Sequence, residues 1–173
     1  LPRIVGVEKA LEMVTSGQHV PAKAALAMGL FDELVEEGQL RAGALAFAKT
    51  VLAEKRPLAK VRDLNAKVEA ARGKPEIFAD FRKANAKKFR GFMAPENNIK
   101  CIEAAVNLPF EEGLKAERKL FMELMTGSQS AAQRYVFFAE RQAAKIPDVP
   151  DDTPLIPVKK VGVIGAGTMG GGI

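Results

Sequence analysis

Residues 110–125 read FEEGLKAERKLFMELM, and this stretch sets the fold class. Its apolar residues recur at helical spacing, so they share one face of an α-helix; they are Leu114, Phe121, Leu124 and Met125. Glu111 and Glu112 lie near the N-terminal end, where the helix dipole favours carboxylates. Gly127 follows the apolar pattern and ends it. The stretch therefore predicts an amphipathic helix.

The residues after Gly127 predict a second helix beside the first. Ser130 and Gln133 have the spacing of a capping box. Apolar residues then continue at steps of three and four, namely Ala132, Tyr135, Ala139, Ala143 and Ile146. Because the break between the two helices is short, we expect them to form an antiparallel hairpin.

Helical spacing also dominates the chain before residue 110. We expect helices over residues 7–14, 22–28, 39–52 and 95–106, and a more polar helical stretch over 61–90. Pro21 suits the first turn of a helix, and Gly29 suits a left-handed cap at its end. Residues 30–35 are predicted as a turn leading into a short strand. The whole chain is therefore predicted to be mainly α-helical.

A proline-rich linker separates these helices from a different kind of sequence. Residues 146–157 contain four prolines and three aspartates, which favours a semi-rigid linker. Residues 160–173 read KVGVIGAGTMGGGI, an apolar strand pattern that runs into G-x-G-x-x-G. Gly165 permits the tight turn, Gly167 leaves room for a pyrophosphate, and Gly170 lets helix and strand pack closely. This end predicts the first strand and glycine turn of a dinucleotide-binding fold.

Composition limits the classes of function. Of the 173 residues 47% are hydrophobic and 27% are charged, as in a globular protein, and no apolar run approaches the roughly 20 residues of a membrane span. One cysteine, Cys101, excludes an internal disulfide and fits a buried structural position. The net charge of +5 suggests an anionic partner. No nucleic-acid-binding motif accompanies the basic residues, however, so a solvated helix face explains them better; examples are Lys83, Lys87, Lys88 and Arg90.

Few residues of the sequence could carry catalysis. His19 is the only histidine and lies beside a turn, so we do not expect a Ser–His–Asp triad. No second His or Cys stands at metal-ligand spacing. Three adjacent carboxylate pairs lie at turns or helix starts, where solvation explains them; they are Glu36–Glu37, Glu111–Glu112 and Asp151–Asp152. We therefore predict no catalytic residue and no metal site, and only the three glycines of the turn as cofactor-binding residues.

Several stretches together resemble the multifunctional fatty-acid oxidation enzymes. Residues 1–17 and 22–35 resemble the later part of the crotonase (enoyl-CoA hydratase) fold. Residues 110–124 and 135–141 resemble the linker helices of these enzymes. Residues 161–173 resemble the opening strand and glycine turn of their 3-hydroxyacyl-CoA dehydrogenase part. The resemblance covers nearly the whole chain and keeps the family's order.

The resemblance implies a division into four regions. Residues 1–52 would be the C-terminal part of a crotonase-like domain, and residues 53–145 a linker helical region. Residues 146–158 would be the proline-rich linker, and residues 159–173 the start of an NAD-binding dehydrogenase domain. The implied fold is mainly α, with the first strand and glycine turn of a truncated Rossmann domain.

The resemblance also implies a parent enzyme that hydrates 2-enoyl-CoA and oxidises 3-hydroxyacyl-CoA with NAD. Its partners would be acyl-CoA substrates, in the bacterial cytoplasm or the peroxisomal matrix. The family's catalytic residues would lie upstream of Leu1 and downstream of Ile173, so we expect the chain alone to be inactive. The unpaired strand Val161–Ile164 would favour self-association.

An alternative interpretation rests on charge alone. The chain would then be a basic helical binding module for an acidic partner or nucleic acid, with a glycine-rich tail that has no function.

Overall fold

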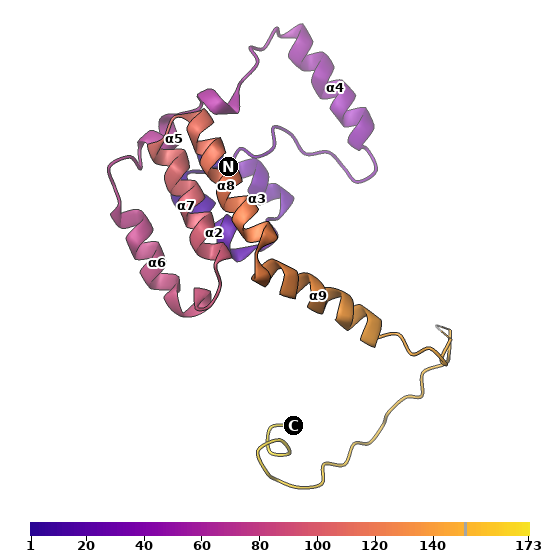
Figure 1. The fold of residues 1–173 in the computed structure, drawn as a ribbon. Coiled ribbons are helices and arrows are strands. Elements are labelled where there is room, and N and C mark those ends of the chain that lie inside the picture. Colours follow the sequence, from indigo (N-terminus) through magenta and orange to yellow (C-terminus); the bar gives the residue numbers. More distant parts are fainter. Residues whose placement is uncertain (151) are drawn as a thin grey trace. The chain divides into compact units, whose positions relative to one another are not determined.

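The computed structural model describes residues 1–150 and 152–173 (Figure 1). Position 151, which belongs to the predicted linker and to the Asp151–Asp152 pair, lies outside the described residues. The described residues form nine α-helices and one 3₁₀ helix: α1 (Pro2–Val5), α2 (Val7–Ser16), α3 (Ala22–Ala27), α4 (Leu40–Ala53), η1 (Val61–Asp63), α5 (Ala66–Glu69), α6 (Glu76–Phe89), α7 (Ala94–Asn107), α8 (Phe110–Thr126) and α9 (Ser128–Ala143). The prediction of a mainly α-helical chain is confirmed.

Neither of the two predicted strands forms. Residues 30–35 and 161–164 carry no strand structure, and the described part of the chain contains no other strand. A β-strand is stable only when its backbone pairs with a neighbouring strand. Without such a neighbour, these apolar stretches remain irregular.

Gly29 confirms the predicted left-handed cap at the end of α3. Its φ is +81°, a conformation that glycine adopts without a steric penalty. The Gly29 N–H donates to the carbonyl oxygen of Leu26 and the Leu30 N–H to that of Ala25, each at 2.9 Å. These two bonds satisfy carbonyl groups that the helix end would otherwise leave unpaired.

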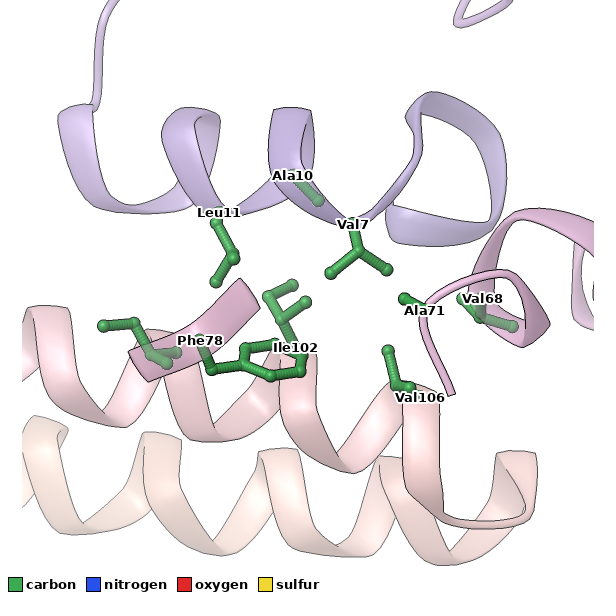
Figure 2. Packing of buried hydrophobic residues seen from close by; sticks show 9 residues of the cluster. Val7, Ala10, Leu11, Val68, Ala71, Phe78, Ile102 and Val106 are labelled. Atoms are coloured by element: carbon green, nitrogen blue, oxygen red, sulfur yellow. The ribbon is translucent and has the colours of Figure 1, made fainter. Parts of the chain in front are cut away.

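The hydrophobic core forms where α2 packs against α7 (Figure 2). The α2 residues Val7, Ala10 and Leu11 are buried, as their helical spacing predicts, and Val14 packs at the edge. Residues from α5 to α7 complete the cluster; they are Val68, Ala71, Phe78, Ile99, Ile102 and Val106. Helix α8 packs along α7 but has no buried residue of its own.

Arg82 of α6 joins α6 to α7 through two carboxylates. Its guanidinium donates two hydrogen bonds to Glu96, both at 2.9 Å, and two to Glu103, at 2.7 and 3.0 Å. The bonds to Glu103 and then to Glu96 raise the pKa of Arg82. The bond from Arg82 lowers the pKa of Glu96 below its ordinary value of 4.5. The ion pair between Arg82 and Glu96 therefore stabilises the fold only while the carboxylate of Glu96 is ionised.

We expect the effect of replacing Arg82 by methionine to depend on pH. Because the folded-state pKa of Glu96 is lowered, its contribution is complete above pH 4.5 and is lost as the pH falls through the folded pKa. At pH 7 the variant should lose about 1 kcal/mol of unfolding free energy, a modest loss because these side chains are partly exposed. Urea unfolding at pH 7 and pH 3 measures the difference. An equal loss at both pH values would contradict the role of the ion pair.

The chain divides into two compact units, Leu1–Gln133 and Arg134–Ile173. Helix α9 begins in the first unit and ends in the second, and a single residue, Gly127, separates it from α8. The predicted hairpin of α8 and α9 therefore stays a prediction. The four predicted regions also stay predictions. A division of this chain into compact units does not test which domain type each region belongs to.

Candidate dinucleotide-binding turn

The second unit carries the glycine turn that the sequence singles out. Gly165 has a φ of +99°, in the region that favours glycine, and reverses the chain after the apolar residues 161–164. The Gly171 N–H donates to the carbonyl oxygen of Gly167 at 2.9 Å, and the Gly172 N–H to that of Met169 at 3.1 Å. The first of these bonds has the spacing of an α-helix. The chain thus makes the turn and one helical turn after it, although no strand precedes them.

Gly170 lies directly against the first glycine of the turn. A Cβ atom at this position would collide with the carbonyl oxygen of Gly165 and would lie 3.4 Å from Cγ1 of Val163. No side chain fits there unless the backbone moves. The role of Gly170 in packing a helix against a strand stays a prediction, because residues 161–173 form neither element.

Gly167 faces open space. A Cβ atom built on it meets no atom within 4 Å, so the fold itself would accept a side chain there. Within the described residues, no backbone carbonyl accepts a hydrogen bond from the N–H groups of residues 166–170. Free N–H groups at the start of a helical turn are the donors that bind a pyrophosphate. Lys159 and Lys160, shortly before the turn, are exposed and add positive charge.

The other residues considered from the sequence do not gather into a site. His19 is exposed between α2 and α3. The carboxylates Glu36 and Glu37 are exposed in a turn, and Glu111 and Glu112 are exposed at the start of α8, where they pair with Arg62 and Lys115. The described residues contain no group of three or more His, Cys, Asp or Glu side chains that could hold a metal ion.

Cys101 differs in part from its prediction. It is half-buried rather than buried, because it faces an apolar groove of about 380 Å³ between α7, α8 and the N-terminal helices. Burial raises the pKa of its thiol, and the carboxylate of Glu117 raises it further. A thiol with a raised pKa is a poor nucleophile at neutral pH. The groove itself was not predicted, since it depends on which helices meet.

None of the helices in the described residues combines the length and the apolar character needed to cross a membrane.

Comparison with known proteins shows similarity along the whole chain. It is 37% identical over 178 residues to the peroxisomal bifunctional enzyme of Cavia porcellus and 35% identical to that of Homo sapiens. It is 38% identical to the fatty acid oxidation complex subunit alpha of Shewanella loihica. Each match covers all of this chain and 24% of the relative, so the chain spans about a quarter of the length of these proteins. No protein-family model matches the chain.

The relatives come from animals and from a bacterium. The animal proteins are named as bifunctional enzymes, and the bacterial protein is named as a subunit of a fatty acid oxidation complex. The resemblance expected from the sequence is therefore confirmed: over its whole length, this chain is similar to about a quarter of multifunctional fatty-acid oxidation enzymes.

Proposed function

We propose that this chain is part of an enzyme that hydrates 2-enoyl-CoA and oxidises the resulting 3-hydroxyacyl-CoA with NAD. The observation that carries the proposal is the glycine turn, which has the close approach at Gly170 and the open side at Gly167. Similarity of the whole chain to multifunctional enzymes supports it. The relatives' names, which mention peroxisomes and fatty acid oxidation, support a peroxisomal or bacterial location for the whole protein. Acyl-CoA substrates for the whole protein are part of the same proposal.

The chain's own contribution would be to bind the cofactor. Free N–H groups of residues 166–170 would hold the pyrophosphate of NAD, and the missing side chain at Gly167 would let it approach the backbone. NAD supplies the hydride acceptor when it is bound. Residues 159–173 form no strand, so no sheet surrounds the turn within the described residues. We therefore expect the 173-residue chain alone to bind NAD weakly.

A chimera tests this proposal. Residues 1–173 would replace the matching quarter of the Cavia porcellus enzyme, and both hydration of crotonyl-CoA and NAD-dependent oxidation of 3-hydroxybutyryl-CoA would be measured. We expect both activities, and we expect Gly167→Val to remove the oxidation and leave hydration intact, since its side chain would block the cofactor but not the fold. Oxidation that survives Gly167→Val would contradict the assignment of the turn.

Two further interpretations rank below this one. The exposed side chains of Val161 and Ile164 support self-association of the isolated chain through its unpaired backbone. The alternative of a basic module for an acidic partner or nucleic acid rests on charge alone. Similarity that extends through the glycine-rich end favours the enzyme instead.

A further inference from the structure

One face of helix α4 is apolar and yet exposed among the described residues. No residue of α4 is buried. One side of it packs against Val35, whose side chain would collide with any Cβ atom at Gly43. At about 100° per residue, another side presents Leu45, Ala48 and Leu52 in a single stripe. Leu45 is 56% exposed and Leu52 is 77% exposed. This apolar stripe is exposed in the part of the chain that the structure describes.

The apolar groove beside α8 matches this stripe in length and in charge. Its α8 wall includes Leu114, Glu117, Phe121 and Leu124 at successive turns. The groove follows α8 from Phe110 to Leu124, about 21 Å, and the 14 residues of α4 also span about 21 Å. Phe121 is 55% exposed, and within the described residues no Lys, Arg or His side chain forms an ion pair with Glu117. The groove thus offers an apolar surface that contains the carboxylate of Glu117, and the guanidinium of Arg3 and the N-terminal ammonium of Leu1 line it as well.

The connections of α4 let it reach the groove and fix its direction. Residues 54–60 join the end of α4 to Val61, which itself lines the groove. Seven residues span about 25 Å at most. Arg62 lies 4.8 Å from the ring centroid of Phe110, so Val61 marks the end of the groove where α8 begins. The C-terminal end of α4 would therefore lie at the start of α8, and the two helices would run antiparallel.

We propose that α4 docks into this groove of its own chain, antiparallel to α8. The register that follows has three pairs: Leu52 with Leu114, Lys49 with Glu117, and Leu45 with Phe121. The paired residues on α4 are three and four positions apart, and so are their partners on α8. All three pairs can therefore form at the same time. Docking removes apolar surface from water on both helices and pairs two opposite charges. The short tether favours the groove of the same chain over that of a second copy.

Cross-linking to Cys101, the one cysteine of the sequence, tests the docking. Asn97 donates to the carbonyl oxygen of Leu120, and Gly113 lies beside Ala104, so Cys101 is level with Glu117. In the full chain, Ala48→Cys would be treated with a short bismaleimide. Ala46→Cys is the matched control, because it is exposed on the same helix but about 200° away from residue 48.

We expect Ala48→Cys to form an intramolecular cross-link about tenfold faster than Ala46→Cys, at a rate independent of protein concentration. Equal rates for the two variants would overturn the docking. A covalent dimer as the main product would overturn docking within one chain and assign the groove to a second copy.

Exchange of the charged pair tests the register. Lys49→Glu should slow the cross-link of Ala48→Cys, and adding Glu117→Lys should restore it. Each cross-linking rate is divided by the rate at which a monofunctional maleimide reacts with the same variant. This corrects for thiol reactivity, because Glu117 also raises the pKa of the Cys101 thiol. If Lys49→Glu has no effect, or if the exchanged pair fails to restore the rate, the proposed register is wrong.

Discussion

Replacing Leu11 by alanine should lower the free energy of unfolding of the chain by about 2–5 kcal/mol. Leu11 is fully buried in the cluster where α2 packs against α7, with 0% of its surface exposed. The substitution removes apolar contacts and leaves a cavity that neighbouring helices fill only in part. Since a domain of this size is stable by about 5–15 kcal/mol, the loss is a large share of the total.

Urea unfolding followed by circular dichroism measures this loss, and Leu58→Ala is the control. Leu58 is 88% exposed and lies outside the helices, so the same change of side chain should alter stability by less than about 0.5 kcal/mol. Equal losses for the two variants would mean that the α2–α7 cluster is not the core of the first unit.

Replacing Gly170 by alanine should reduce NAD-dependent oxidation by the chimera by about 100-fold or more and leave hydration unchanged. The added methyl group would collide with the carbonyl oxygen of Gly165, so the backbone of the turn would have to move. A shift of the turn would displace the N–H groups that are proposed to hold the pyrophosphate.

Gly162→Ala is the matched control for this prediction. It adds the same methyl group eight residues earlier, where a Cβ atom meets nothing within 4 Å. The control should keep both activities. Full oxidation by Gly170→Ala would show that the close approach of Gly170 and Gly165 is not needed for cofactor binding.

Local features of the fold could be predicted from the sequence. The left-handed cap at Gly29 depends on backbone preferences of a few neighbouring residues and takes the expected form. Gly165 likewise has a positive φ, although the predicted strand before it does not form. The buried face of α2 also follows its apolar spacing, because a helix with one strongly apolar face packs with that face inward.

Other features depend on residues far apart in the sequence. The apolar face of residues 110–125 is as regular as that of α2, yet its residues Leu114 and Phe121 remain exposed, whereas the α2 residues Ala10 and Leu11 are buried. Nothing in the local spacing tells which amphipathic face will meet another helix. In the same way, the two glutamates that accept hydrogen bonds from Arg82 lie 14 and 21 residues away in the sequence, and no short motif predicts them.

The sequence by itself determined the helical class of this chain, its resemblance to multifunctional fatty-acid oxidation enzymes and the positive φ at Gly165, because each rests on local spacing or on the identity of residues. Only the tertiary structure decided the core around Leu11, the half-buried environment of Cys101 and the apolar groove along α8. The physical reason is that burial is a property of pairs of helices: a side chain leaves water only when a second surface covers it.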